Sequence, residues 1–395
     1  MKNTLLYTHF FPPADGAASV RIYYFAKALK KGGFNLKVIA PKPQNVKIPS
    51  DTNKSDFSIK YIPTIFTSSK SKYLRLISYA VYFVLSFFRA ILSGKLDMVF
   101  TSSPPITTAL GAALVAKLRK KKLIVDIRDI WPDIGAELKI IKNSFLLRIF
   151  SLMEKFIYNS ADLILVTADG DKKNLINKGV NQNKINIIRN GVDLNIFIPL
   201  DNERKKTIRE KYNLPVNKKV VIYFGSLNLG MNDIDTLADF FSNLQDSDFH
   251  FLVVGNGAKK KELERKINPS ISKTFLKSLP PQQIAELVAS SDVSIIPRKK
   301  ITKDTGGNIP VKCFESWACG IPVLLSTIKG TELEKIFNES NGGILVEPGD
   351  WKKLREGFNK ILNTKFDKSE MRNFVSAKFD RIKQSMKVTE LIEKL

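Results

Sequence analysis

Cysteine and histidine are scarce in this sequence of 395 residues, which contains two of each. Cys313 and Cys319 lie close together without a second pair, so the sequence supports neither a disulfide framework nor a zinc site. A reduced, cytosolic setting is therefore expected. The first residues run straight into a strand-like segment and lack the charged, apolar and small-residue regions of a secretory signal.

Acidic residues are also in deficit, because 38 Asp and Glu stand against 63 Lys and Arg, which gives a net charge of +25. Residues 1–195 hold 30 basic and 13 acidic residues, so this half carries +17 and the remainder +8. A positive field favours anionic partners such as nucleic acid, phosphosugars or acidic lipid headgroups. A lysine-rich composition that merely keeps the protein soluble is the alternative.

One long hydrophobic run occurs, Leu74–Leu92, and its length is close to that of a membrane span. It contains Arg75 and Arg89, and no acidic residue occurs from Lys70 to Leu96. We therefore expect an interfacial helix whose exposed side, with Arg75 and Arg89, contacts anionic lipid. A buried core helix and a true membrane span are the alternatives.

The remaining composition is that of a globular protein, with 44% hydrophobic and 26% charged residues, and the length predicts two domains. Short apolar, β-branched runs alternate with longer amphipathic stretches, as in βαβ units with parallel sheets. The predicted strands are 4–8, 36–40, 97–101, 123–127, 163–167, 185–188, 220–224, 249–254, 293–296 and 323–326.

This alternation predicts an α/β fold of two Rossmann-like, doubly wound domains in series. Turn-forming residues from Arg189 to Pro199 interrupt the pattern and place the boundary near residue 198, which gives domains 1–198 and 199–395. The final stretch, Lys368–Leu395, is predicted to be helical and to pack back on the first domain.

Two turns that follow strands of the first domain contain candidate site residues, because doubly wound folds bind ligands at the carboxyl ends of strands. Gly16 and Ala17 open the helix after the first strand, where free backbone amides favour an anion of the acceptor. A simple tight turn is the alternative reading of Gly16.

The segment VDIRDIWPD after the fourth predicted strand gathers acids, an arginine and an aromatic residue. Arg128 is a candidate for acceptor binding, and Asp129 is the carboxylate that we expect to accept or position a hydroxyl proton. Asp126 lies within the apolar run and Asp133 follows Pro132, so either is read instead as a cap or a turn residue.

In the second domain, Gly225, Ser226 and Asn228 occupy a turn whose backbone donors suit a pyrophosphate. The next turn, Gly255-Asn256-Gly257, resembles the opening of a dinucleotide fingerprint, but Lys260 stands where the third glycine belongs, so NAD binding is disfavoured. Two acidic pairs have the spacing of a metal motif and are read as a helix cap or a polar loop, namely Asp233 with Asp235 and Asp246 with Asp248.

The segment Gly306–Pro322 carries the strongest signal for a ligand site. Its glycines lead into a helix that places Lys312 and Glu315, three positions apart, on one face. The helix-start amides and the Lys312 ammonium can neutralise a diphosphate, and the Glu315 carboxylate can accept two hydrogen bonds from a ribose diol. A solvated ion pair between Lys312 and Glu315 is the alternative.

Several motifs in this order resemble the glycosyltransferase 4 family, and within it the branch that builds bacterial surface polysaccharides, including N-acetylfucosamine-type transferases. They are FFPPADGAASVR, VDIRDIWPD, RNGVDLNIF and IPVKCFESWACGIPV, with Glu154 ahead of the Asp162 strand. The resemblance implies the GT-B fold, in which two Rossmann-like domains face a cleft. It also implies transfer of a sugar, with retention, from a nucleotide-diphosphate donor, without a metal or other cofactor.

By the same resemblance, Glu315 holds the donor ribose, and Gly307, Asn308 and Lys312 lie beside the diphosphate and sugar. Two positions depart from the family pattern. Gly307 stands where many members have a glutamate, and the loop from Gly225 has no basic residue where many have an arginine and a lysine. We expect Lys312 and Arg298 to supply the missing positive charge, and the departures concern donor identity more than activity.

We therefore expect a hexosyl- or N-acetylhexosaminyltransferase that takes a UDP-linked donor and a lipid-linked saccharide acceptor in O-antigen, lipopolysaccharide, capsule or other surface polysaccharide synthesis. It is expected to be cytoplasmic and peripheral on the inner face of the cell membrane. A nucleotide-sugar epimerase of the same fold is one alternative. It would need a catalytic cluster of acids and histidines, and His9 and His250 are the only histidines in the sequence. A nucleic-acid-binding protein is another, disfavoured by scattered lysines and absent aromatic stacking motifs.

Overall fold

The computed structural model describes residues 2–12, 16–42, 57–64, 72–137, 139, 141–228, 230–244, 248–300 and 309–395, without the side chains of residues 72, 73, 75 and 76. Contacts divide the chain into two compact units. The first comprises the described residues up to Asn190 together with Ile382–Leu395, and the second those from Gly191 to Arg381. The chain thus enters the second unit at Gly191, before the boundary near residue 198 that the sequence predicted.

The first unit is built on a parallel sheet with the strand order β3-β2-β1-β4-β5-β6-β7. Its strands are β1 (Asn3–Tyr7), β2 (Asn35–Pro41), β3 (Ser58–Ile62), β4 (Met98–Ser103), β5 (Lys122–Ile127), β6 (Leu163–Val166) and β7 (Ile185–Ile187). The order reverses between β1 and β4, so their carboxyl ends form the topological switch point at which such sheets bind ligands.

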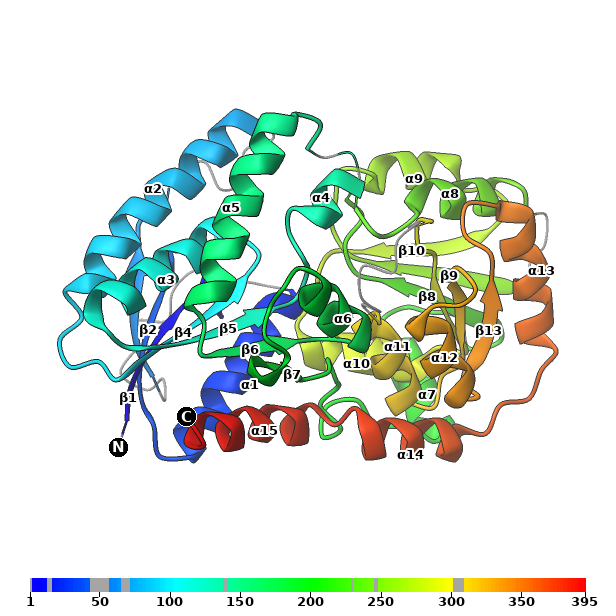
Figure 1. The fold of residues 1–395 in the computed structure, drawn as a ribbon. Coiled ribbons are helices and arrows are strands. Elements are labelled where there is room, and N and C mark those ends of the chain that lie inside the picture. The colour runs from blue at the N-terminus through cyan, green and yellow to red at the C-terminus, as the bar shows by residue number, and fades with distance from the viewer. Residues whose placement is uncertain are drawn as a thin grey trace. The chain divides into compact units, whose positions relative to one another are not determined.

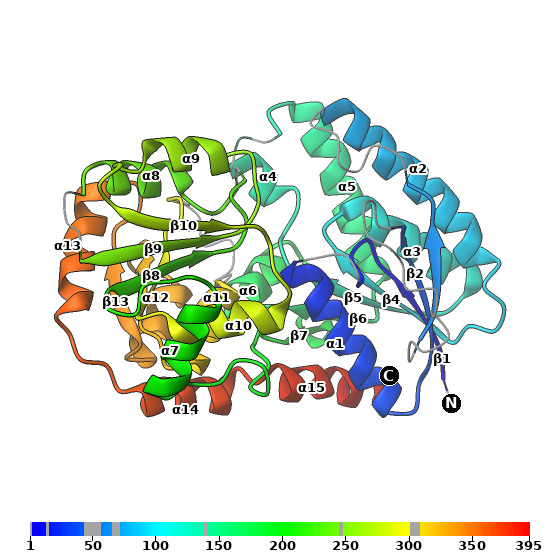
Figure 2. The ribbon, with the colours of Figure 1, turned by 180° about the vertical axis from the view of Figure 1, so that it is seen from behind.

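Helices cover both faces of this sheet (Figures 1 and 2). They are α1 (Ala17–Lys31), α2 (Lys72–Ile91), α3 (Ile106–Arg119), α4 (Asp133–Glu137), α5 (Ser144–Ser160), α6 (Asp169–Asn177) and the end of α15 (Arg381–Glu393). Leu5 and Tyr7 join the core beneath α2, α3 and α5, whereas Leu6 packs with α1 and with Val388 and Ile392 of α15. This alternation follows from the two-residue period of a strand.

The second unit repeats the design with the parallel order β10-β9-β8-β11-β12-β13, and its switch point lies between β8 and β11. Its strands are β8 (Lys219–Phe224), β9 (Phe249–Val254), β10 (Ser272–Leu276), β11 (Val293–Ile296), β12 (Val323–Ser326) and β13 (Gly343–Val346). The fold prediction of two doubly wound α/β units is confirmed.

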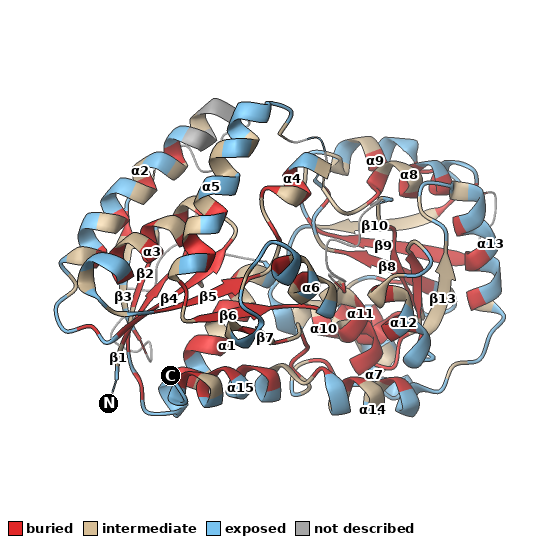
Figure 3. Ribbon diagram, in the orientation of Figure 1, coloured by how far each residue is buried: buried red, intermediate tan, exposed pale blue. Residues whose placement is uncertain are grey.

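The helices of the second unit are α7 (Asn202–Lys211), α8 (Ile234–Ser242), α9 (Lys260–Lys266), α10 (Pro281–Ser290), α11 (Val311–Ala318), α12 (Glu332–Glu339), α13 (Trp351–Leu362) and α14 (Lys368–Lys378). One sheet face packs against α10, α11, α12 and α14, and the other against α8, α9 and α13. Both faces are therefore buried, as Figure 3 shows for the central strands.

Three strands were not predicted from the sequence, β3, β10 and β13, and all of them lie at sheet edges. In β3 and β10, polar residues interrupt the apolar run that marks the central strands. The sequence of β13, Gly343–Val346, is apolar but only four residues long. The stretch 368–395 is helical as predicted, but it forms two helices, because α14 and α15 are separated at Phe379 and Asp380. There the backbone of Phe379 and Arg381 pairs with Val192 instead of continuing a helix.

Candidate active site

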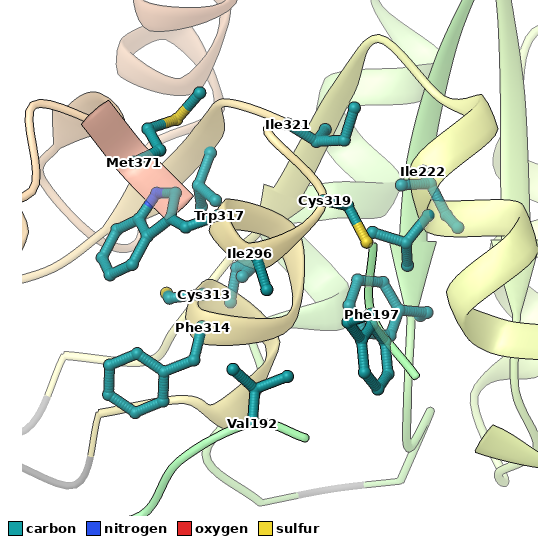
Figure 4. Close-up of a cluster of buried hydrophobic side chains, with 14 of the residues drawn as sticks. Val192, Phe197, Ile222, Ile296, Cys313, Phe314, Trp317, Cys319, Ile321 and Met371 are labelled. Carbon is teal, nitrogen blue, oxygen red and sulfur yellow. The ribbon is translucent and has the colours of Figure 1, made fainter. Parts of the chain in front are cut away.

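The two faces of α11 have different environments. Cys313, Phe314 and Trp317 are buried in the core of the second unit (Figure 4), and the Trp317 indole donates a hydrogen bond to the Gly342 carbonyl at 2.8 Å. Lys312 and Glu315 are only partly buried. Packing of the apolar side of α11 thus fixes the helix that carries both charged groups.

The Lys312 ammonium is held by groups from the strand and loop of β8. Its nitrogen lies 4.8 Å from the ring centroid of Tyr223 and donates a hydrogen bond to the Asn232 side-chain oxygen at 3.3 Å. Burial lowers the pKa of Lys312 to about 8, against the influence of Glu315, which raises it. The ammonium is therefore poorly solvated, and an anionic ligand would offset the cost of its desolvation.

Gly225 makes the position of Lys312 possible. Its φ is +126°, and a Cβ at this residue would lie 2.5 Å from Cε and 2.7 Å from Nζ of Lys312. Any other residue would be strained and would displace the lysine side chain. Gly225 therefore contributes to the candidate donor site by leaving room for Lys312.

The Glu315 carboxylate accepts no hydrogen bond from the part of the chain that the structure describes. The side chain of Glu315 is 18% exposed. The nearest ion-pair contact within the described residues is the Arg381 guanidinium, at 4.0 Å from Oε1. Burial raises the pKa of Glu315, whereas the charges of Arg381 and Lys312 lower it. A ligand with two hydroxyl donors would satisfy both carboxylate oxygens.

Arg298 follows β11 and therefore lies across the switch point from Gly225, which follows β8. Its backbone amide donates a hydrogen bond to the Ser326 hydroxyl at 2.6 Å. Its charge also lowers the pKa of Lys312, although burial has the larger effect. The structure therefore brings Lys312, Arg298 and Glu315 into one electrostatic neighbourhood at the expected end of the second sheet.

Of the other predicted donor-site residues, Ser226 and Asn228 form hydrogen bonds within and between loops, and Gly307 and Asn308 lie outside the described residues. The Ser226 carbonyl accepts hydrogen bonds from the Tyr223 hydroxyl at 2.7 Å and the Asn232 side chain at 3.0 Å. The Asn228 side-chain oxygen accepts the Ala258 amide at 2.9 Å, which joins two neighbouring loops. The segment 301–308, with Gly307 and Asn308, lies outside the described residues.

Of the two acidic pairs with the spacing of a metal motif, the structure explains the role of Asp233. Asp233 caps α8 by accepting the Thr236 amide at 3.2 Å and the Thr236 hydroxyl at 2.7 Å, as the cap reading predicted. Asp246 lies outside the described residues. Across the residues that the structure describes, no three potential metal ligands are grouped.

In the first unit, Asp126 belongs to a buried ion pair. Nη2 of Arg21, in α1, lies 2.8 Å from Oδ1 of Asp126, and the side chains of Arg21 and Asp126 are 5% and 0% exposed. The Ser102 hydroxyl donates to Oδ2 at 3.2 Å. Asp126 is thus part of β5 and of the core, and its reading as a cap or turn residue was wrong.

Arg128 and Asp129 follow β5 at the carboxyl end of the first sheet. Arg128 donates hydrogen bonds to the Ser102 hydroxyl at 3.0 Å and the Pro104 carbonyl at 2.5 Å, and its guanidinium lies 5.3 Å from the Phe10 ring centroid. Burial lowers the pKa of Arg128, and the charges of Asp129 and Asp126 raise it. Asp129 is therefore close enough to Arg128 to interact with it electrostatically.

His9 follows β1 at the same switch point and was given no role from the sequence. Its ring contacts Phe10, Tyr79 and Tyr82 at centroid distances of 5.2, 5.2 and 5.0 Å. Burial, and then the charge of Arg128, lower the pKa of His9 to about 4, so the imidazole is neutral near pH 7. Its Nδ1 is buried and has no hydrogen-bond partner among the described residues.

Gly16 caps α1 with φ +108°, and both Gly16 and Ala17 are exposed. The first turn of α1 contains no acidic residue, and no side chain of the described residues caps its amides. These amides can therefore bind an anion.

Sequence reasoning missed Arg21, Asn232 and Arg381. Arg21 closes the motif FFPPADGAASVR and could have been sought as a partner for Asp126 in an apolar strand. Asn232 and Arg381 carried no comparable signal, because their contacts with Lys312 and Glu315 depend on tertiary packing.

The predicted interfacial segment forms α2, in which Arg89 is exposed and the Arg75 side chain lies outside the described residues. None of the described helices has the length and apolar character needed to cross a bilayer. Tyr82 and Ala90 are buried against the sheet, so the helix has one face in the core. Ile77, Val84, Leu85, Phe88 and Leu92 are exposed.

Residues 18–196 match the family described as Glycosyltransferase Family 4, and residues 204–378 match Glycosyl transferases group 1. The chain is 22% identical over 225 residues to D-inositol 3-phosphate glycosyltransferase of Corynebacterium urealyticum, which covers 54% of this chain and 51% of that protein. It is 23% identical over 277 residues to "Putative colanic acid biosynthesis glycosyl transferase WcaI" of Escherichia coli, at 68% and 67% coverage. The chain thus spans about half the length of the first relative.

Solved structures share this fold. Anabaena HepE in complex with UDP and glucose aligns with a TM-score of 0.75 at 15% identity, over 100% of both chains. UDP-GlcNAc 2-epimerase of Methanocaldococcus jannaschii aligns with a TM-score of 0.59 at 13% identity, also over 100% of both. The likeness shows the fold alone, because two enzyme classes share it. The chain thus consists of a Glycosyltransferase Family 4 domain followed by a Glycosyl transferases group 1 domain, and it has the GT-B fold.

Proposed function

We propose that the protein transfers a sugar from a UDP-linked donor to a lipid-linked saccharide in surface polysaccharide synthesis, with retention and without a metal. The observation that carries this proposal is the grouping of Lys312, Arg298 and Glu315 at the switch point of the second sheet. Two cations suit a diphosphate, and a carboxylate to which no described residue donates a hydrogen bond suits a ribose diol. UDP bound to HepE and the name of WcaI support the choice of donor and pathway class.

The chemistry releases one proton from the acceptor hydroxyl, which a nearby group must take up. That oxygen forms a bond to the anomeric carbon while the bond from this carbon to the diphosphate oxygen breaks. Asp129 and a phosphate oxygen of the donor receive or position the hydroxyl proton, and UDP leaves. Lys312 and the amides at the start of α11 stabilise the charge that develops on the diphosphate.

We propose that the acceptor binds the first unit, with its anionic group at Gly16 and Ala17 and near Arg128. The α1 amides have no acidic neighbour in the first helical turn. Arg128 keeps its charge next to Asp129 although it is largely buried. The α1 amides and Arg128 would thus bind the phosphate of the acceptor, and Asp129, at the same end of the sheet, would contact its reacting hydroxyl.

A lipid-linked acceptor also requires contact with a membrane, for which we propose an apolar surface formed by α2 and α5. The α3 helix packs against both, and Figure 3 shows their exposed sides. The exposed apolar residues of this surface are Ile77, Val84, Leu85, Phe88, Leu92, Phe145, Leu146 and Leu152. Arg89, Arg148 and Lys155 are exposed on the same helices and suit an anionic leaflet on the cytoplasmic side.

Co-sedimentation with vesicles tests this surface. We expect the protein to bind vesicles of phosphatidylglycerol and to bind phosphatidylcholine vesicles far less. The double variant Phe88→Ser/Leu152→Ser should lose binding, while Val216→Ser, an exposed apolar residue of the second unit, should retain it. Equal sedimentation of all three proteins with the anionic vesicles would refute the α2 and α5 surface.

Calorimetric titration with UDP tests the donor site. Lys312→Met and Glu315→Gln should each weaken UDP binding by about tenfold or more, because each removes hydrogen bonds to a charged group. Lys360→Met removes an exposed lysine of α13 and should leave the affinity unchanged. Unaltered affinity in both site variants would reject the assignment. Conversion of a UDP-sugar to its epimer without an acceptor would favour the epimerase alternative.

A further inference from the structure

The segments at which the chain enters and leaves the second unit, at Gly191 and Arg381, are paired with each other. The Val192 amide donates to the Phe379 carbonyl at 2.9 Å, and the Arg381 amide donates to the Val192 carbonyl at 3.0 Å. Gly191 has no side chain where a Cβ would collide with the Phe379 carbonyl. The packing explains why the RNGVDLNIF motif has a glycine at this position, because the two segments can approach only where residue 191 has no side chain.

Arg381 connects this pairing to the candidate donor site. Its Nε and one terminal nitrogen both donate to the Gly191 carbonyl, at 2.9 and 2.6 Å. The same terminal nitrogen lies 4.0 Å from Oε1 of Glu315, and the two side chains are 13% and 18% exposed. The backbone of Gly191 therefore fixes the direction of the guanidinium, which faces Glu315 within ion-pair range.

The separation of 4.0 Å has a chemical consequence for Glu315. It exceeds hydrogen-bond distance, so Arg381 provides a positive charge without occupying an acceptor site of the carboxylate. The charge of Arg381 opposes the rise in the pKa of Glu315 that burial causes, and both carboxylate oxygens can accept hydrogen bonds from a ligand.

We propose that Arg381 is a positioning residue that holds the Glu315 carboxylate charged and oriented for the two ribose hydroxyls of the donor. This inference rests on the proposed function, in which Glu315 binds the ribose. It assigns to the paired segments at Gly191 and Arg381 a part in selecting ribonucleotides over their deoxy analogues, since Glu315 acquires its hydroxyl preference through Arg381.

The test compares the affinities of UDP and 2′,3′-dideoxyuridine 5′-diphosphate, measured by calorimetry on the full chain. The wild type should prefer UDP by about tenfold or more, since the analogue cannot donate to a charged acceptor. Arg381→Gln keeps a donor for the Gly191 carbonyl and removes the charge, and it should reduce the preference to about threefold or less. Arg381→Lys keeps the charge and should retain more of the preference than Arg381→Gln.

Arg372→Gln is the matched control. Arg372 also binds backbone carbonyls of the second unit, at Phe197, Leu194 and Ala318, with distances of 2.8, 3.1 and 2.6 Å. Its loss should affect stability and leave the UDP preference as in the wild type. If both Arg381 variants fold and keep the wild-type preference, or if Arg372→Gln loses it equally, the role of Arg381 is refuted. A wild type that binds no UDP refutes the donor proposal itself, and one that binds both nucleotides equally refutes the pairing of Glu315 with the diol.

Discussion

The Lys312 ammonium lies over the aromatic face of Tyr223, 4.8 Å from the ring centroid, and is poorly solvated there. Burial lowers the pKa of this lysine to about 8, while Glu315 raises it and Arg298 lowers it. The free protein therefore loses this positive charge when the pH rises through about 8, well below the usual pKa of lysine, 10.5.

We predict that UDP binding weakens as the pH rises above about 8, because only the ammonium form of Lys312 pairs with the diphosphate. The dissociation constant should increase by up to about tenfold per pH unit between pH 8 and 9.5. Calorimetry in buffers of different ionisation heat should also detect proton uptake on binding. The variant Lys312→Met should show neither effect, and an equal pH dependence in this variant would contradict the prediction.

Gly225→Ala should destabilise the protein and weaken UDP binding together. The positive φ costs an alanine of order 1–3 kcal/mol, and its Cβ would displace the Lys312 side chain. Urea unfolding and UDP titration measure the two effects. Gly230→Ala is the matched control in the same loop, because a Cβ there has no atom within 4 Å and its φ is not in the positive range. Similar losses in both variants would show that the loop merely resists substitution.

Arg21→Met should lower the free energy of unfolding by about 3–5 kcal/mol, because it leaves the Asp126 carboxylate buried without its ion-pair partner. Lys387→Met, at an exposed position of α15 in the same unit, should change it by less than about 0.5 kcal/mol. Urea unfolding of the two variants provides the measurement. A loss below about 1 kcal/mol for Arg21→Met would mean that Asp126 is satisfied without Arg21.

Asp129→Asn should lower kcat by about 10²–10⁴-fold and leave UDP affinity unchanged. The asparagine keeps the size of the side chain and cannot take up a proton, and UDP is proposed to bind the other unit. Transfer assays with a lipid-linked acceptor, together with UDP titration, separate the two quantities. Full turnover in this variant would assign the hydroxyl proton to another group.

Sequence periodicity predicted the parts of the fold that are buried on both sides. The central strands β1, β4, β5, β8 and β9 are apolar runs, and their alternation with helices determined the two-unit architecture. The edge strand β3 was not predicted, because its residues are mostly exposed or half-buried and its sequence lacks a continuous apolar run. The break between α14 and α15 was not predicted, because it results from the pairing of Phe379 with Val192, which is far away in sequence.

The sequence predicted the donor-site residues that lie on one helix or directly after a strand, such as Gly225 and Arg298, but not their tertiary contacts. Lys312 and Glu315 share a local spacing, so their joint presentation follows from helix geometry. The contacts of Lys312 with Tyr223 and Asn232, and of Glu315 with Arg381, join residues far apart in sequence. Asp126 was misread for the same reason, since its partner Arg21 lies in another element.

Hydrogen exchange of the wild-type protein, with and without saturating UDP, shows where the nucleotide binds. The diphosphate and ribose are proposed to bind at the switch point of the second sheet, beside α11. We predict slower exchange in peptides that cover residues 225–232 and 309–318, with Lys335 of α12 in an unaffected peptide of the same unit. Protection confined to the first unit, or no change at saturation, would contradict the account.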